Sequence, residues 1–422
     1  MKAPRTLIFF TLQYPYGKKS ETFIENEIQY LANAFERVII IPREKKEHTK
    51  RELPQNVEVN DMLITSKPVG NRFKFILSSI KRLLAVCSIY GYTVLKDKYR
   101  KHYLTGGYFI YYLANALKDA ELIHNYIENS QLKQAVIYDY WFVNSTLSLA
   151  YLKSKGTIKN VYCRAHGFDV FNERWACGTV PFREYILKHA DAVYAISDYN
   201  KRYIQKQLND HKAKVKVAYL GVRHPQGLLV SKNEIEATTE FLIVSCANLA
   251  EFKQIHRIPE VLKHVELGKR SIKWVHFGDG PYETEVLNAA KQLPKGIDFE
   301  YKGHVANQNV LDFYAENNVN LFLSLSLKEG LPVSMMEAQS FGVPIMAYDI
   351  FGIPEIVSQE TGVLLQTKNS NAEISQKLTQ LLQTHPFFDK DQIERAFNER
   401  FNAKSNYSAF VKQLVEKNGY DT

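Results

Sequence analysis

The chain has 422 residues, of which 45% are hydrophobic and 23% charged, and its formal net charge is +9. This composition is typical of a folded protein and excludes an intrinsically disordered one. The length exceeds that of one compact core and therefore predicts two domains. The positive charge favours anionic partners such as nucleotide phosphates, nucleic acid or an acidic membrane surface.

Targeting signals and the spacing of cysteines indicate the cellular compartment of the protein. The apolar segment near the N-terminus is too short for a signal peptide or a spanning helix, and no later run reaches spanning length. The cysteines show no paired spacing and are predicted to be reduced, mostly buried thiols: Cys87, Cys163, Cys177 and Cys246. We therefore expect a protein of the cytoplasmic side.

The first half of the chain alternates apolar strands with helices, a pattern typical of a parallel α/β sheet. Strands are predicted at 6–12, 38–41, 135–140, 161–165, 192–196 and 215–219, and helices at 20–31, 114–127 and 144–152. Ser20 and Ser197 are predicted helix N-caps. Gly17 and His166 follow two of the strands, at the edge where such sheets bind ligands, although a lone turn glycine or histidine is more often structural.

A basic segment, residues 71–103, contains eight lysines and arginines and one acid, Asp97, together with apolar residues at helical spacing. A basic amphipathic helix of this kind can lie on an anionic membrane. A core helix with a solvated basic side explains the same pattern equally well. Both interpretations stay open.

A second alternating half follows a segment without periodicity. Residues 223–240 combine proline, glycine and mixed charges, so we expect a linker there. Further strands are predicted at 241–245, 272–277, 297–301 and 319–324, and helices at 259–265, 282–293 and 309–315. The predicted domains are residues 1–222 and 241–400, with a C-terminal helix at 401–422 packing back on the first.

The stretch from Ser324 to Gly352 carries the most specific chemistry. A buried strand ends in a turn that contains Glu329 and Gly330, and a helix that begins near Pro332 contains Glu337. Gly330 permits close approach of a ligand, and the helix start offers N–H groups to an anion. Carboxylates repel phosphate but accept hydrogen bonds from hydroxyls. The pattern therefore predicts a nucleotide sugar, which carries hydroxyls on both sides of its diphosphate.

Other polar motifs are weighed against simpler explanations. Lys253 follows the first strand of the second half and is a candidate to neutralise a diphosphate, although a surface lysine is the alternative. The backbone of residues 303–305 is placed to meet a flat base. The G-D-G-P at 278–281 lacks the third glycine of a dinucleotide motif, which argues against hydride chemistry. Asp389 and Asp391 are better explained by helix capping than by metal binding.

The segment from Glu329 to Glu337 resembles the paired-glutamate motif of the retaining glycosyltransferases of family four, which have the GT-B fold. R-A-H-G-F-D around His166, Lys253 and the G-I-P-E-I-V that starts at Gly352 extend the resemblance over nearly the whole chain. It implies two doubly wound Rossmann-like domains that face a central cleft, the first binding an acceptor and the second a nucleotide-sugar donor. The opening Y-P-Y-G-K-K-S-E-T-F-I-E-N-E-I is similar to a bacterial subgroup associated with exopolysaccharide or lipopolysaccharide assembly.

The resemblance implies roles for the matching residues of the second half. Glu337 would bind the ribose hydroxyls and Glu329 a hydroxyl of the donor sugar. The N–H groups of Gly330 and Leu331 would lie beside the sugar or phosphate. Lys253 would hold the diphosphate.

The remaining implied roles concern the base and the first domain. Val305 would contact the base, His166 the donor sugar near the reacting centre, and Gly17 would leave room for the diphosphate. Family members retain anomeric configuration without requiring a protein nucleophile. We expect no metal or other cofactor.

Two departures from the family pattern are present. Asn248 stands where the family usually has an arginine that binds the diphosphate, and His256 or Arg257 could compensate. The turn reads E-G-L-P instead of the commoner E-G-F-G-L-P, so the choice of donor sugar does not transfer.

The sequence thus predicts a hexose transfer, with retention, from a UDP- or GDP-sugar to a glycan or lipid-linked glycan. Peripheral contact with the inner face of the plasma membrane follows if the membrane interpretation of the basic segment is right, and a nucleic-acid partner is not expected. Two alternatives stay open. One is a GT-B nucleotide-sugar epimerase or hydrolase, and the other is a non-catalytic nucleotide-binding partner of a glycosyltransferase.

Overall fold

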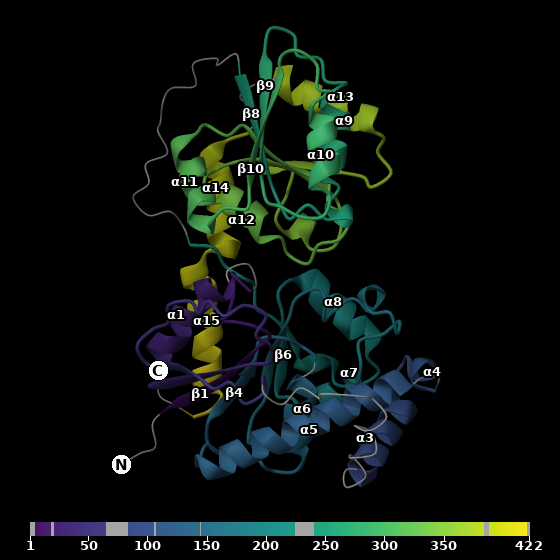
Figure 1. Cartoon of the computed structure of the whole chain (residues 1–422), viewed down its shortest axis with the longest axis vertical. Helices are drawn as coiled ribbons and strands as arrows, with labels where there is room; N and C mark the ends of the chain where they lie inside the picture. Colours follow the sequence, from purple (N-terminus) through teal and green to yellow (C-terminus); the bar gives the residue numbers. More distant parts are fainter. Residues whose placement is uncertain are drawn as a thin grey trace. The chain divides into compact units, whose positions relative to one another are not determined.

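The computed structural model describes residues 5–17, 21–64, 83–104, 107–143, 145–223, 240–383 and 388–419. The chain divides into two compact units: unit 1 comprises Met1–Tyr219 and Asn406–Thr422, and unit 2 comprises Leu220–Ser405. Each unit is built on its own parallel sheet with flanking helices (Figure 1). Most of the predicted linker, residues 224–239, and much of the basic segment, residues 71–82, lie outside the described ranges.

Unit 1 contains a seven-stranded sheet in the order β3-β2-β1-β4-β5-β6-β7, and all neighbouring strands run parallel. Since β1 lies inside the sheet, the chain winds outward from it in both directions, and the order reverses between β1 and β4. Ligands of such sheets bind outside the carboxyl ends of the strands at this point. The strands are β1 (Thr6–Thr11), β2 (Arg37–Pro42), β3 (Val57–Val59), β4 (Val136–Asp139), β5 (Tyr162–Ala165), β6 (Ala192–Ala195) and β7 (Val215–Val217).

Helices cover both faces of this sheet. One face packs against α1 (Ile24–Ala34) and α15 (Ala403–Glu416), and the other against α5 (Gly107–Asn129) and α6 (Ser145–Ser154). The other helices of the unit are α3 (Leu83–Lys96), α4 (Arg100–Tyr103), α7 (Arg183–His189) and α8 (Asp198–Gln207). Apolar side chains of both helix pairs interlock with the strands, which gives the unit its core.

Two predicted helix starts have different outcomes. Ser197 is the N-cap of α8, because its hydroxyl accepts a hydrogen bond from the N–H of Asn200 at 3.0 Å, as predicted. The first helix, α1, begins at Ile24, later than predicted, and Phe23 stands at its N-cap. The predicted cap, Ser20, lies outside the described residues.

A buried ion pair ties the C-terminal helix to unit 1. Arg164 on β5 is fully buried, and its Nη2 lies 3.1 Å from Oε1 of Glu27 on α1. The guanidinium also donates to the Ala218 carbonyl at 2.9 Å and lies 4.4 Å from the ring centroid of Phe410 on α15. A charge in such a core needs these partners, since an unpaired buried charge is strongly destabilising.

Unit 2 repeats the winding of unit 1 with a six-stranded parallel sheet in the order β10-β9-β8-β11-β12-β13. The strands are β8 (Glu240–Cys246), β9 (Ser271–Phe277), β10 (Ile297–Gly303), β11 (Leu321–Ser324), β12 (Ile345–Tyr348) and β13 (Gly362–Leu365). The sequence did not indicate β12 and β13. With these strands, both units are doubly wound Rossmann-like folds, which confirms the predicted fold class.

The helices of unit 2 are α9 (Ile258–Leu262), α10 (Glu283–Ala290), α11 (Asn307–Glu316), α12 (Val333–Gln339), α13 (Asn371–Gln383) and α14 (Lys390–Phe401). Asp389 caps α14 by accepting hydrogen bonds from the N–H groups of Asp391 and Gln392, so the capping interpretation is confirmed.

The loop after β9 needs its glycines for packing. Gly278 has φ +131°, and a Cβ there would lie 1.9 Å from the Ala247 carbonyl oxygen.

Candidate functional site

The turns that follow β8 and β11 bring Lys253 and Glu329 together in unit 2. Nζ of Lys253 lies 2.6 Å from Oε1 of Glu329, and both side chains are largely buried. The N–H of Leu327 donates to the carbonyl of Phe252 at 2.8 Å, which fastens one turn to the other. Each charge neutralises the other, so an anionic ligand at Lys253 has to compete with Glu329 for the same ammonium group.

Glu337 lies on α12 and is almost completely buried. Burial raises its pKa to about 7, against the lowering effect of a hydrogen bond from Asn307, whose Nδ2 donates to Oε1 at 2.8 Å. Asn307 is the first residue of α11 and was not predicted as a site residue. The sequence signal that could have indicated Asn307 is its position two residues after Val305, which was predicted to contact the base. The carboxylate and the amide together can bind a pair of neighbouring hydroxyls.

The turn that carries Glu329 is supported from β12. A Cβ on Gly352 would lie 2.2 Å from the carbonyl oxygen of Gly330, so only glycine allows this approach. Leu331 is buried beside it, and α12 begins at Val333. The glycine that follows the paired glutamates therefore shapes the turn that the resemblance assigns to the sugar and phosphate.

Val305 and Asn248 lie on two other loops at the carboxyl edge of the sheet. Val305 lines a cavity of about 370 Å³ whose other walls come from the ends of β9 and β10 and from α11: Phe277, Lys302, Asn309, Asp312, Phe313 and Glu316. Asn248 is exposed in the turn after β8, where its carbonyl accepts from the N–H of Ala250 at 2.9 Å. The predicted contacts of Val305 with a base and of Asn248 with a donor stay predictions.

Arg257 and His256 are poorly suited to replace the missing arginine. Arg257 donates from Nη1 to the Tyr348 hydroxyl at 2.9 Å and from Nη2 to Oδ1 of Asn371 at 2.7 Å, so its guanidinium is engaged within unit 2. The His256 ring packs on Tyr282, and burial together with Arg257 lowers the pKa of the imidazole. A neutral imidazole at pH 7 adds no charge for a diphosphate.

In unit 1, His166 follows β5 inside a group of aromatic rings. Its ring centroid lies 4.6 Å from that of Tyr140, 4.7 Å from Trp141 and 5.7 Å from Phe23. The His166 N–H donates to Oδ1 of Asp169 at 2.7 Å, which fixes the backbone. In the part of the chain that the structure describes, neither ring nitrogen has a hydrogen-bond partner. Both ring nitrogens are buried, and Nδ1 lies 3.8 Å from Oδ2 of Asp169, so the ring is held in place within this group.

Glu21, which the sequence did not indicate, occupies the loop after β1. Its carboxylate accepts hydrogen bonds from the N–H groups of Leu12 at 3.0 Å, Gln13 at 2.6 Å and Tyr14 at 2.6 Å, and from Nε1 of Trp141 at 2.6 Å. Its backbone has φ +52°, a conformation that is uncommon outside glycine and asparagine. The carboxylate thus fills an anion-binding loop from within.

Gly17 lies in the same loop with φ +79°, and its N–H donates to the Thr49 carbonyl at 2.9 Å. A Cβ at this position would meet the Glu47 carboxyl group at 3.4 Å. The space beside Gly17 therefore faces a carboxylate that a diphosphate would have to displace. The predicted role of Gly17 stays a prediction.

Across the described ranges, no group of three or more His, Cys, Asp or Glu side chains is arranged to hold a metal ion. The expectation that no cofactor is needed stays a prediction.

Comparison with known proteins finds similarities for the C-terminal part of the chain. The family model "Glycosyl transferases group 1" matches residues 230–399. The putative colanic acid biosynthesis glycosyltransferase WcaL of Escherichia coli (strain K12) is 24% identical over 244 residues, 57% of this chain and 57% of that protein. The amylovoran biosynthesis glycosyltransferase AmsD of Erwinia amylovora is 22% identical over 232 residues, 55% and 62% of the two chains. The alignment thus spans about three fifths of each relative.

Solved structures resemble the whole chain. The lipopolysaccharide outer core galactosyltransferase WaaB matches with a TM-score of 0.68 and 14% identity over 98% of this chain and 99% of its own. Anabaena HepE in complex with UDP matches with a TM-score of 0.61 and 13% identity over 98% and 100%. These likenesses define the class of the fold, which is GT-B. Residues 230–399 match the model of the glycosyl transferases group 1, which agrees with the paired-glutamate motif.

Proposed function

We propose that this chain transfers a hexose, with retention, from a UDP- or GDP-sugar to a glycan or lipid-linked glycan during bacterial surface polysaccharide synthesis. The observation that carries the proposal is the Lys253–Glu329 pair in the same unit as the buried Glu337. One cation accompanied by two carboxylates suits a diphosphate that links two groups rich in hydroxyls. The named relatives are a putative colanic acid biosynthesis glycosyltransferase and an amylovoran biosynthesis glycosyltransferase, which supports the polysaccharide class.

Donor binding would exchange one ion pair for another. The diphosphate takes the ammonium of Lys253, and the Glu329 carboxylate then becomes free to accept hydrogen bonds from the donor sugar. Glu337 and Asn307 bind the two ribose hydroxyls in the same way. Because Glu329 and Glu337 are largely buried, their hydrogen bonds to a ligand are stronger than in water.

The reaction needs no protein nucleophile. The bond between the anomeric carbon and the diphosphate oxygen breaks, and an acceptor hydroxyl oxygen bonds to that carbon on the same face. The acceptor proton goes to the departing diphosphate, so a nucleoside diphosphate and an elongated glycan are the products. Following the resemblance, we propose that His166 contacts the donor sugar, which positions that sugar for attack.

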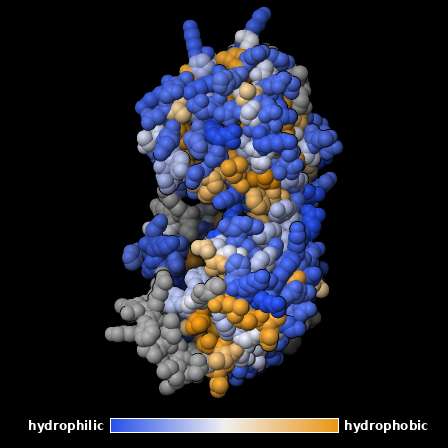
Figure 2. Space-filling view, turned by 90° about the vertical axis from the view of Figure 1, so that its right-hand side faces the viewer, coloured by the Kyte–Doolittle hydropathy of each residue, from blue (hydrophilic) through white to orange (hydrophobic). Residues whose placement is uncertain are grey.

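A peripheral membrane contact is part of the proposal. Leu84 and Leu95 on α3 are 88% and 76% exposed, and Leu104 after α4 is 68% exposed. Figure 2 shows hydrophobic residues gathered on the face that carries α3, α4 and the start of α5 in Figure 1. The same segment of the chain carries four exposed basic residues: Lys96, Lys98, Arg100 and Lys101. Across the described ranges, no helix combines the length and apolarity needed to cross a bilayer.

This surface would lie on an anionic bilayer, where its leucines enter the interface and its cations attract acidic headgroups. The nearby acid, Asp97, is buried, whereas the four basic side chains are exposed, so the surface itself is positively charged. We expect the protein to co-sediment with phosphatidylcholine vesicles that contain phosphatidylglycerol. The double variant L84D/L95D should lose this binding, whereas unchanged co-sedimentation would refute the membrane contact.

Incubation with a panel of nucleotide sugars, with and without bacterial glycan acceptors, tests the catalytic proposal. Transfer gives nucleoside diphosphate only when an acceptor is present. Conversion without an acceptor would indicate the epimerase or hydrolase, and binding alone would indicate the non-catalytic partner. Glu337→Ala should abolish donor use, while Glu360→Ala, at an exposed position of unit 2, should not.

A further inference from the structure

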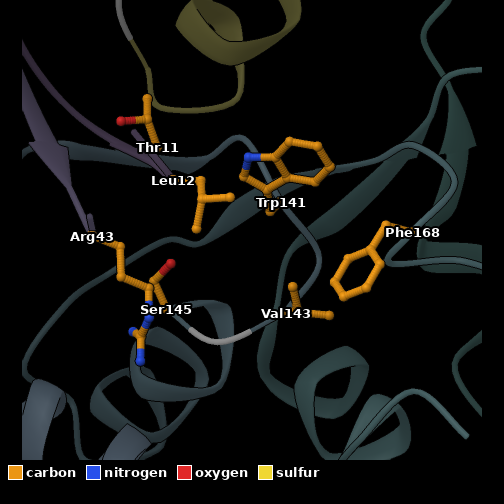
Figure 3. Close-up of a pocket in the computed structure, with 7 residues that line it drawn as sticks. All are labelled: Thr11, Leu12, Arg43, Trp141, Val143, Ser145 and Phe168. Carbon is orange, nitrogen blue, oxygen red and sulfur yellow. The ribbon is translucent and has the colours of Figure 1, made fainter. Parts of the chain in front are cut away.

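A cavity of about 290 Å³ opens in unit 1 where the strand order reverses between β1 and β4 (Figure 3). It is lined by residues at or just after the carboxyl ends of several strands and by the first residue of α6: Thr11, Leu12, Arg43, Trp141, Val143, Ser145 and Phe168. This is the position at which doubly wound sheets bind ligands. Its size is near the lower limit of ordinary ligand pockets, so it suits a single ring better than a large molecule.

Aromatic and aliphatic carbon forms most of the cavity wall. The rings of Trp141 and Phe168 and the side chains of Leu12 and Val143 face the opening in Figure 3. Phe168 is 48% exposed, unusually high for a phenylalanine next to a core. Such walls bind the apolar face of a ring. The Thr11 hydroxyl already donates to the Tyr14 carbonyl at 2.6 Å, so toward a ligand it can only accept a hydrogen bond.

The cavity has no uncompensated charge among its lining residues. Nη1 of Arg43 donates to Oδ2 of Asp119 on α5 at 2.5 Å, and Figure 3 shows the guanidinium beside Ser145, away from Trp141 and Phe168. Behind the wall, Asp139 accepts from the Thr146 hydroxyl at 2.8 Å and is buried. An acidic sugar or a phosphate would therefore find its cation already paired, so the cavity favours an uncharged ring.

Glu21 fixes the orientation of Trp141. The carboxylate joins the Trp141 indole N–H to the backbone of the loop after β1, and Glu21 is only 5% exposed. The same indole ring packs against His166, whose ring nitrogens have no partner among the described residues. Trp141 therefore forms a wall of the cavity and part of the surroundings of His166 at once.

We propose that this cavity binds an uncharged sugar ring of the acceptor, stacked on Trp141, and that Glu21 is a positioning residue that holds Trp141 for this contact. The inference rests on the proposed function, because an acceptor glycan is a substrate of the proposed transfer. An acceptor ring on Trp141 would lie next to His166, whose ring centroid is 4.7 Å from that of Trp141. The acceptor hydroxyl then attacks from a defined direction.

Fluorine NMR of protein labelled with 5-fluorotryptophan tests the proposal, since the chain has three tryptophans and Trp141→Phe assigns the resonance. The probes are the methyl glycosides of glucose, galactose and N-acetylglucosamine, with methyl glucuronide as the charged comparison. We expect at least one uncharged glycoside to shift the Trp141 resonance saturably and to bind at least about tenfold more tightly than the glucuronide. If no uncharged glycoside moves this resonance, or if the glucuronide binds as tightly, the proposal is wrong.

Variants separate the role of Glu21 from general damage. Glu21→Gln should move the Trp141 resonance in the free protein and weaken glycoside binding about tenfold, whereas Glu25→Gln, on the exposed side of the same segment, should change neither. Phe168→Ala, which removes a half-exposed ring, should weaken glycoside binding about fivefold. This variant still tests the proposal if Glu21→Gln does not fold. Unchanged glycoside affinity in Glu21→Gln and in Phe168→Ala would overturn the assignment.

Nucleotide binding distinguishes this inference from the proposed function. Calorimetry with UDP and GDP should give the same affinity in wild type, Glu21→Gln and Phe168→Ala. Wild type that binds a nucleotide but no glycoside at Trp141 would refute the cavity assignment alone. Wild type that binds no nucleotide would refute the proposed function.

Discussion

The buried carboxyl of Glu337 gives a pH-dependent stability that can be worked out from the structure. Burial raises its pKa from the ordinary 4.5 to about 7. One pKa unit corresponds to about 1.4 kcal/mol, so ionised Glu337 costs the folded state about 3 kcal/mol. Below pH 4.5 the group is protonated in both states and has no effect. Between pH 4.5 and 7 the free energy of unfolding falls, and above pH 7 the full cost is present.

Glu337→Gln removes this cost while keeping an oxygen that accepts the hydrogen bond from Asn307. Urea unfolding of both proteins at pH 5 and pH 8 measures the effect. We expect the variant to gain up to about 3 kcal/mol relative to wild type at pH 8, with little gain at pH 5. The difference between the proteins cancels Asp139, whose pKa burial also raises to about 7.

The two units can unfold separately, so the transition of unit 2 should be followed by the fluorescence of Trp274, which is fully buried in its core. Trp141→Phe and Trp175→Phe in both proteins remove the signals of unit 1. A stability difference between variant and wild type that is the same at pH 5 and pH 8 would refute the reasoning.

Three further predictions follow from individual contacts. Arg257→Ala should leave donor affinity within about twofold and lower the free energy of unfolding by about 1–2 kcal/mol, because the Arg257 guanidinium already has partners within unit 2. A tenfold loss of donor affinity in calorimetry would contradict this. Glu27→Gln leaves Arg164 unpaired in the core and should cost about 3–5 kcal/mol in urea unfolding, against no change for an exposed glutamate of α1. In Gly352→Ala the added Cβ clashes with the Gly330 carbonyl oxygen, so nucleotide-sugar binding should weaken at least about tenfold in calorimetry. Wild-type affinity in this variant would show that the turn can move without loss of binding.

The sequence predicted the winding of the sheets because most strands are apolar runs between helices. It missed β12 and β13, which have four residues each and are too short to be distinguished by periodicity from buried loops. It also placed the start of α1 too early. Glu21 adopts a left-handed backbone conformation instead of a helical one, and its carboxylate accepts hydrogen bonds from the backbone N–H groups after β1. This conformation depends on tertiary contacts.

Parts of the candidate site could be predicted for the same physical reason. Lys253 and Glu329 each follow a strand of one parallel sheet, so their side chains meet at the same edge. Two other contacts could not be predicted. Asn307 and Glu337 are 30 residues apart, and Glu21 and Trp141 are 120 apart. These pairs depend on which loops meet in space, and no local pattern records that.

Calorimetric titration of UDP, GDP and ADP into wild type and Lys253→Met tests the central claim most directly, with Lys295→Met as an exposed control in unit 2. The account predicts that at least one of these nucleotides binds wild type and the control equally. It also predicts that Lys253→Met, which cannot neutralise the diphosphate, binds at least about tenfold more weakly. Wild type that binds none of the three, or equal binding by Lys253→Met, would contradict it.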